Sequence, residues 1–313
     1  MSIGWTARDM PDLTGRTAVV TGASSGIGEV TAAELARHGA AVTLAVRDPA
    51  RGDRSAERIR TIAPAADVQV SVLDLADLGS VRRFADDWSR EHPEGLDLLV
   101  NNAGVMAVPR RQTADGFELQ LGTNHLGHFA LTGRLLPALV ARPRSRVVTV
   151  SSNAHRMGRI HFDDLQGARR YGPWRAYAQS KLANLLFTAE LDRRARAAGV
   201  GIRATAAHPG LSSTHLVAAG PAARYGTAGE RVSGWVTAVL GQSATMGALP
   251  TLFAATMPDL PPAAYVGPGG VGEQRGYPRL VGRSAAAADL DAARRLWDVS
   301  EDLTGVRYPL DDR

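Results

Sequence analysis

Residues 17–28 read TAVVTGASSGIG, a short β-type run that leads directly into a glycine-rich turn. A helical pattern follows from Ile27 to His38, and Gly39 stands in the usual stop position. Glycines at such a turn let a pyrophosphate approach the helix N-terminus, where free N–H groups and the helix dipole favour anions. The motif is weak alone, but its place after the first strand predicts a nucleotide site. Its residues are Gly22, Ser24, Ser25, Gly26, Ile27 and Gly28.

The alternation of strand and helix patterns continues to residue 206. Strands are expected at 17–20, 41–46, 68–72, 96–100, 146–150 and 202–206. Helices are expected at 27–38, 51–62, 78–90, 119–140, 177–198 and 285–303. Apolar strands between helices predict an α/β fold, a Rossmann-type doubly wound parallel sheet flanked by helices. We expect one domain over residues 1–313, with 211–280 as a variable substrate-binding segment inside it.

Composition excludes several classes of function. The 313 residues include no cysteine, so disulfides, thiolate metal sites and cysteine nucleophiles are excluded. The net charge of +5 comes from arginines spread along the chain among 31 acids, so we expect no nucleic-acid partner. The first residues contain no apolar core of signal-peptide length, and later apolar runs are short. We therefore expect a cytoplasmic protein without a membrane anchor.

The basic residues number 36, and only one of them is a lysine, Lys181. Tyr177 precedes it by four positions, which puts both on one face of the predicted helix. The ordinary pKa of tyrosine, about 10, is high for proton exchange near neutrality, and an ammonium beside the phenol is expected to lower it. Lysine is a compact charge, whereas the planar fork of arginine is a poor substitute at a tight position. The pair is therefore a candidate for proton transfer.

The end of the second strand is where a dinucleotide's 2′-ribose position is normally read. An acid there favours NAD, whereas an arginine accommodates the 2′-phosphate of NADP. The chain has Arg47 followed at once by Asp48. We favour NADP, with NAD as the alternative.

Together with other motifs, these features resemble the short-chain dehydrogenase/reductase superfamily over roughly residues 15 to 215. Stretch 147–165 and the run Ser180 to Asn184 are similar to its retinol dehydrogenase-like branch. The matching pieces, in the family's order, are Thr21-Gly22-x3-Gly26-x-Gly28, Asp74-Leu75, Asn101-Asn102-Ala103-Gly104, Asn124, Ser151-Ser152, Tyr177-x3-Lys181 and His208-Pro209-Gly210.

The resemblance implies a catalytic role for four residues. Tyr177 would be the general acid/base, and Lys181 would lower its pKa and hydrogen-bond the nicotinamide ribose. Ser152, rather than the adjacent Ser151, would hydrogen-bond the substrate oxygen, and Asn124 would hold a water that links Lys181 to solvent. Further cofactor contacts are implied at Asp74, Leu75, Asn101, Ala103, Gly104, Pro209, Gly210 and Thr214.

The resulting hypothesis is an NAD(P)-dependent oxidoreductase that acts on a small-molecule alcohol, aldehyde or ketone. The alternative is a redox-inert dinucleotide-binding sensor or scaffold on the same fold. Histidine pairs such as His125 with His128, or His155 with His161, lack a carboxylate that would complete a ligand set, so we expect no metal. The sequence leaves open whether the chain forms a homo-oligomer.

Overall fold

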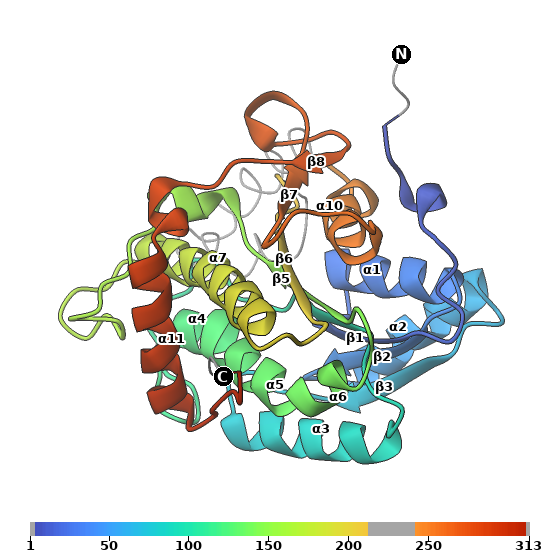
Figure 1. Cartoon of the computed structure of the whole chain (residues 1–313), viewed down its shortest axis with the longest axis horizontal. Coiled ribbons are helices and arrows are strands. Elements are labelled where there is room, and N and C mark those ends of the chain that lie inside the picture. Colours follow the sequence, from blue (N-terminus) through green and yellow to red (C-terminus); the bar gives the residue numbers. More distant parts are fainter. Residues whose placement is uncertain (1–3, 212–241, 311–313) are drawn as a thin grey trace, which may run out of the picture.

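A computed structural model describes residues 4–211 and 242–310 of the chain. Its centre is an eight-stranded sheet in the order β3-β2-β1-β4-β5-β6-β7-β8, in which all neighbours are parallel except the antiparallel β7–β8 pair (Figure 1). The predicted doubly wound α/β sheet is confirmed. The strands are β1 Thr17–Thr21, β2 Ala41–Val46, β3 Val68–Val72, β4 Leu98–Asn101, β5 Arg146–Val150, β6 Arg203–Ala207, β7 Tyr265–Pro268 and β8 Pro278–Leu280.

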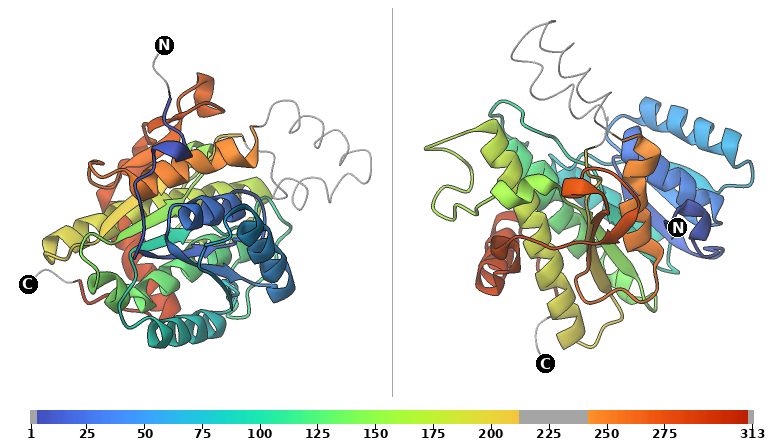
Figure 2. Two further views of the ribbon diagram at one scale, coloured as in Figure 1. Left: turned by 90° about the vertical axis from the view of Figure 1, so that its right-hand side faces the viewer. Right: turned by 90° about the horizontal axis from the view of Figure 1, so that it is seen from above.

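Helices cover both faces of this sheet (Figures 1 and 2). One face carries α1 Gly26–Arg37, α2 Pro49–Ile62 and α10 Ala244–Thr256. The other face carries α3 Leu78–Glu91, α5 Gly127–Arg134, α6 Leu136–Val140 and α7 Pro173–Ala197, with α11 Leu290–Thr304 packed outside α7. Short 3-10 turns are η1 Ala7–Asp9, η3 Asn153–Met157, η5 Val271–Glu273 and η6 Ala285–Ala288. None of the helices described is long and apolar enough to span a membrane.

The structure corrects several of the expected elements. The helix predicted over 119–140 is divided into α4 Leu119–Leu121, a π-helical turn η2 Gly122–Leu126, α5 and α6. It breaks at Leu135, whose ψ of 1° leaves the helical range two residues before Pro137. Helix α7 begins at Pro173, four residues before its expected start, because proline suits the first helical position.

Strands β7 and β8 were not predicted at all. Strand β7 is four residues long and ends in Gly267 and Pro268, so it carries no periodic apolar signal. Strand β8 has three residues, two of them exposed. Both owe their conformation to pairing at the edge of the sheet, which a local pattern cannot reveal.

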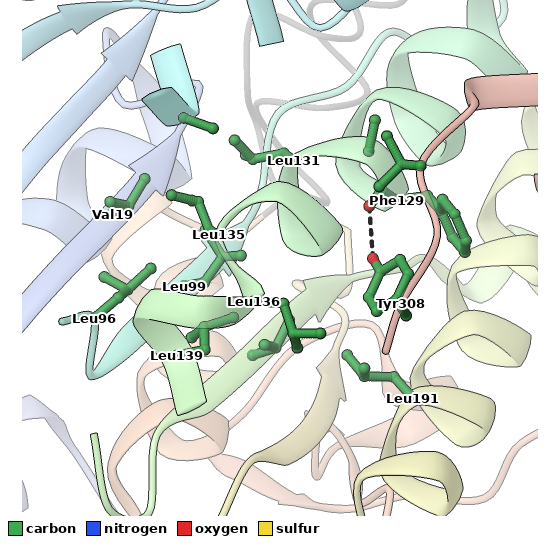
Figure 3. Close-up of a cluster of buried hydrophobic side chains, with 14 of the residues drawn as sticks. Val19, Leu96, Leu99, Phe129, Leu131, Leu135, Leu136, Leu139, Leu191 and Tyr308 are labelled. Carbon is green, nitrogen blue, oxygen red and sulfur yellow. Dashed lines mark hydrogen bonds between the residues drawn. The ribbon is translucent and has the colours of Figure 1, made fainter. Parts of the chain in front are cut away.

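The hydrophobic core between the sheet and helices α3, α5, α6 and α7 anchors the C-terminal helix α11 to the rest of the fold (Figure 3). The Tyr308 hydroxyl donates a 2.6 Å hydrogen bond to the Phe129 carbonyl oxygen of α5. Trp297 of α11 packs against Phe129 and Phe187, with ring centroids 5.1 and 5.9 Å apart. Helix α7, which carries Phe187, is therefore enclosed between the sheet and α11.

The strand order reverses direction at β1 and β4, which are neighbours in the sheet. Ligands of open α/β sheets bind in the crevice that such a reversal leaves beyond the carboxyl ends of the strands. Here the hydroxyl of Thr21, the last residue of β1, accepts hydrogen bonds of 2.9 and 3.0 Å from the N–H groups of Asn102 and Ala103, which follow β4. The fold thus brings the two predicted cofactor motifs together.

Candidate active site

The glycine-rich turn after β1 is packed so closely that its glycines cannot carry side chains. Gly22 has a φ of +68°, and a Cβ there would lie 2.9 Å from the Ala103 Cα. A Cβ on Gly28 would lie 2.5 Å from both the Gly22 carbonyl oxygen and Asn102 Nδ2. Helix α1 begins at Gly26, and the side chain of its N-cap, Ser25, makes no capping hydrogen bond. The first N–H groups of α1 therefore suit a bound phosphate.

The two asparagines at the end of β4, Asn101 and Asn102, make different contacts. The Asn101 side chain, predicted to line the cofactor channel, is buried and donates to the Thr132 hydroxyl at 3.0 Å. Asn102, which the sequence did not single out, donates from Nδ2 to the Thr21 carbonyl oxygen at 2.8 Å and supports the glycine turn. Its place in the same motif as Asn101 was the only available signal.

Other predicted cofactor residues lie around the same edge of the sheet. Asp74 is half-buried just beyond β3, and its Oδ1 accepts a 2.9 Å hydrogen bond from the Ala76 N–H. The Leu75 side chain packs in the hydrophobic core, and its contact with the cofactor stays a prediction. Pro209 and Gly210 follow β6 and are half-buried, whereas Thr214 lies outside the described residues.

Arg47 and Asp48 at the end of β2 have separate environments. Asp48 is the N-cap of α2, and its carboxylate accepts a 3.2 Å hydrogen bond from the Arg51 N–H. Arg47 is exposed, and no salt bridge to it occurs within residues 4–211 and 242–310. The acid that obscured the cofactor prediction is thus engaged in helix capping.

Tyr177 is buried on α7, with Ser152 as its hydroxyl neighbour. Burial raises the pKa of the phenol above its ordinary value, and the hydrogen bond with Ser152 opposes this increase. Ser152 is half-buried and accepts a 3.2 Å hydrogen bond from the Ala154 N–H. Ser151 is directed elsewhere, because its hydroxyl donates to the Lys181 carbonyl oxygen at 2.7 Å. Of the two serines, Ser152 is therefore the one that influences the phenol.

Lys181 is 4% exposed, and its ammonium donates a 3.0 Å hydrogen bond to the Val150 carbonyl oxygen at the end of β5. The Nζ atom lies 5.9 Å from the centroid of the Tyr177 ring. Burial lowers the pKa of Lys181 to about 8, so the ammonium is still the main form at pH 7. Burial dominates at the phenol, so the net shift of the Tyr177 pKa is upward and not the expected lowering.

Asn124 lies within the π-helical turn η2, and both polar atoms of its side chain are hydrogen-bonded. Its Oδ1 accepts a 2.8 Å hydrogen bond from the Val105 N–H, and its Nδ2 donates to the Val105 carbonyl oxygen and the Ser180 hydroxyl. Gly104 lies beside it, since a Cβ there would be 3.1 Å from Asn124 Oδ1 and 3.5 Å from Lys181 Nζ. Asn124 and Lys181 thus both lie next to Gly104.

A buried histidine, His128, joins this turn to the cofactor crevice, a role that no local sequence signal predicts. His128 Nδ1 lies 3.0 Å from the Asn124 carbonyl oxygen, and Nε2 lies 2.9 Å from the Thr21 hydroxyl. Burial lowers the pKa of His128 to about 3. Nearby His125 is also buried, with Nε2 2.9 Å from the Ser300 hydroxyl and a pKa lowered to about 4. In the described part of the chain, no three histidines or carboxylates gather as a metal site.

Comparisons with known proteins give this arrangement a family. Residues 16–224 match the model of the short chain dehydrogenase family. The chain belongs to this family. Human Retinol dehydrogenase 11 is 42% identical over 299 residues, covering 96% of this chain and 88% of that protein. Human Retinol dehydrogenase 13 is 41% identical over 300 residues, covering 94% and 86%. The predicted membership of the retinol dehydrogenase-like branch is confirmed.

Solved structures agree with the assignment of this dehydrogenase. A crystal structure of an uncharacterized protein from Mycobacterium paratuberculosis is 50% identical, with a TM-score of 0.81, and the match covers 98% of this chain and 100% of that one. A short chain dehydrogenase from Escherichia coli CFT073, complexed with NADPH, is 28% identical, with a TM-score of 0.55, covering 67% and 83%. The dehydrogenase is therefore an oxidoreductase that acts on alcohol or carbonyl groups and uses a nicotinamide cofactor.

The buried histidines make the stability of this dehydrogenase depend on pH. His125, His128 and His208 have folded pKa values of about 4, 3 and 4, below the ordinary 6.5. Below pH 6.5 the unfolded chain binds more protons than the folded one, so the free energy of unfolding falls as the pH is lowered. Each such histidine contributes about 1.4 kcal/mol per pH unit once the pH is below its unfolded value. Urea unfolding between pH 7.5 and 5 should show this decrease.

The variant His128→Gln provides the control for this pH dependence. Whatever its absolute stability, its free energy of unfolding should fall less steeply with pH, because one of the groups that titrates on unfolding is gone. Asp97 does not affect the stability change between pH 7.5 and 5. Its pKa is lowered from 3.8, so its contribution to the free energy of unfolding is lost only at more acidic pH. Equal free energies of unfolding at pH 7.5 and pH 5 would contradict the claim that these buried histidines are neutral in the folded protein.

Proposed function

We propose that the chain is an NADP-preferring oxidoreductase that interconverts an alcohol with an aldehyde or ketone, with Tyr177 as the general acid/base. The observation that carries the proposal is the buried Tyr177 phenol, whose pKa is influenced by the Ser152 hydroxyl and which lies one helical turn from the only lysine of the chain. Two hydroxyls that lie together beyond the carboxyl end of β5 suit the two lone pairs of a substrate oxygen. The proposal assigns that oxygen to them.

The residues around the crevice fit a dinucleotide. The first N–H groups of α1, beside a turn that only glycine can form, suit the pyrophosphate. Asp74 and Gly104 lie along the same edge of the sheet, and Pro209 with Gly210 would approach the nicotinamide end. When bound, the nicotinamide supplies or accepts a hydride.

The protein's own part in the reaction is to hold and move a proton. Ser152 would stabilise the negative charge that develops on the substrate oxygen, and Tyr177 would deliver its proton to that oxygen. Burial keeps the phenol protonated, which is the form that donates. The ammonium of Lys181 would stabilise the phenolate left behind, and Asn124 would hold a water between Lys181 and solvent.

The preference for NADP rests on Arg47. Its exposed guanidinium follows β2, where a 2′-phosphate would lie, and the neighbouring Asp48 carboxylate is engaged at the start of α2. An always-charged planar guanidinium is well suited to phosphate. The NADPH complex of the related E. coli dehydrogenase supports the same choice.

The substrate is proposed to be an apolar or moderately polar carbonyl compound or alcohol. Segment 211–280, proposed to form the substrate-binding part of the domain, carries few charged residues. Part of it, residues 212–241, lies outside the described residues. Relatives named retinol dehydrogenases support an apolar substrate class.

The test is turnover of NADPH and NADH with a panel of aldehydes, ketones and alcohols, comparing wild type with Tyr177→Phe. We expect the variant to lose about 10²- to 10⁴-fold in turnover, the usual contribution of a general acid/base. Its NADPH affinity should stay near the wild-type value, because only a hydroxyl is removed. Tyr308→Phe, which removes the hydroxyl of a buried tyrosine in the core between α5 and α11, is the matched control and should leave turnover of the folded enzyme unchanged. Cofactor binding without turnover of any compound by the wild type would favour the redox-inert sensor.

Arg47→Ala tests the cofactor preference. Loss of a charge-assisted contact to the 2′-phosphate should weaken NADPH binding about 10- to 100-fold and leave NADH binding nearly unchanged. Arg82→Ala, at an exposed position on α3, is the control for the loss of a positive charge. Equal losses for the two cofactors in a fluorescence titration would remove the reason for preferring NADP.

A further inference from the structure

The turn Val271–Gln274, after β7, lies between two segments that frame the proposed site. On one side the Asn153 side chain, next to Ser152, donates to the carbonyl oxygens of Gly272 and Glu273 at 3.3 and 3.4 Å. On the other side the Leu211 N–H donates to the Gln274 carbonyl oxygen at 2.9 Å. One turn thus contacts both the serine segment and the segment that follows Gly210.

The Glu273 carboxylate makes the same connection through its two oxygens. Oε1 accepts a 3.0 Å hydrogen bond from Arg156, which belongs to the 3-10 turn that follows Ser152. Oε2 lies 3.1 Å from His208 Nε2, at the end of β6 and directly before Pro209. The side chain of His208 is 1% exposed and that of Glu273 18%, so the contact between them is largely shielded from water.

The hydrogen-bond pattern determines which nitrogen of His208 carries the proton. The Gly210 N–H donates to Nδ1 at 3.2 Å, so Nδ1 is the unprotonated nitrogen and Nε2–H donates to Glu273. Burial lowers the pKa of His208 to about 4, against the opposing effect of Glu273, and the ring is neutral at pH 7. His208 therefore connects Gly210 to Glu273 in a single orientation.

The backbone shows that this arrangement is imposed by its surroundings. Glu273 has a φ of +57°, a left-handed conformation that residues other than glycine rarely adopt. Such conformations persist where the surrounding structure fixes them, and they gather at functional sites. Gly210, with φ +67°, lies so close to the turn that a Cβ would be 2.3 Å from the Gln274 carbonyl oxygen.

We propose that Glu273 is a positioning residue, which holds the Ser152 segment and the Pro209–Gly210 turn at a fixed separation across the active site. The inference rests on the proposed function, in which Ser152 contacts the substrate oxygen and Pro209–Gly210 borders the nicotinamide. Within the Ser152 segment, His155 Nδ1 lies 2.7 Å from the Ser152 carbonyl oxygen and ties the 3-10 turn to the serine. Glu273 adds a side-chain link that reaches from this segment to His208, directly before the cofactor turn.

The test separates the reach of the side chain from its charge. Glu273→Asp keeps the carboxylate and tolerates a positive φ, but it is one methylene too short to meet both Arg156 and His208. Glu273→Gln loses the charge but keeps the length and an oxygen that can accept from His208. We expect kcat to fall at least fivefold in Glu273→Asp and by a smaller factor in Glu273→Gln. Asp302→Ala, which removes another carboxylate paired with an arginine, on α11, is the control and should keep wild-type kcat.

Binding of the two halves of the cofactor distinguishes positioning from general loss of structure. Glu273→Asp should bind NADPH more weakly, because the Pro209–Gly210 turn that borders the nicotinamide is no longer held in position. Its affinity for 2′,5′-ADP, the adenine half of the cofactor, should stay within twofold of wild type. Equal weakening of both ligands, wild-type kcat in Glu273→Asp, or a larger loss in Glu273→Gln would overturn the inference. A wild-type enzyme that turns over no substrate would instead refute the proposed function.

Discussion

Burial of a single ammonium group at the carboxyl end of the sheet is the constraint on which the rest of the site depends. Lys181 is almost fully enclosed, and its ammonium is bonded to the Val150 carbonyl oxygen. A buried charge is costly unless it is hydrogen-bonded, so its position is strongly specified. The strand end and the helix are joined twice more, by Ser151 to the Lys181 carbonyl oxygen and by Asn184 to the Val150 carbonyl oxygen.

The larger architecture keeps this junction from shifting. Helix α7 is buried along most of its length, because the sheet covers one side and α11 covers the other. The C-terminal helix is itself anchored by Trp297 and by the Tyr308 hydrogen bond to α5. Tyr177 and Trp297, about 120 positions apart, thus belong to one packed assembly. The position of the proposed acid/base therefore depends on packing between α7 and α11.

The sequence was sufficient for the features that local chemistry determines. Glycines 22, 26 and 28 after a β-type run, and a tyrosine four positions before the one lysine, predicted both the α/β fold and the two halves of the site. Proline at position 173 could have placed the start of α7 correctly, because proline favours a first helical position. The hydrogen bond from the Asn101 side chain to Thr132, by contrast, joins residues 31 positions apart and could not be read from the local sequence.

The parts that the sequence missed depend on long-range contacts. Strands β7 and β8 form because an edge of the sheet is available to them, and the role of His128 appears only when β1 and η2 meet. Glu273 is a similar case, since 117 positions separate it from Arg156 and 65 from His208. A lone glutamate in a glycine-rich stretch carries no local signal of such a connection.

Turnover of the charge-preserving variant Lys181→Arg tests the central claim most directly. The claim is that a compact ammonium, not merely a positive charge, is required where Val150 and Gly104 leave little space. We predict that the variant folds with a somewhat lower stability and loses more than about 100-fold in turnover, within the range for losing general acid/base catalysis. Turnover near the wild-type value would contradict the account, and the single lysine would then be an accident of composition.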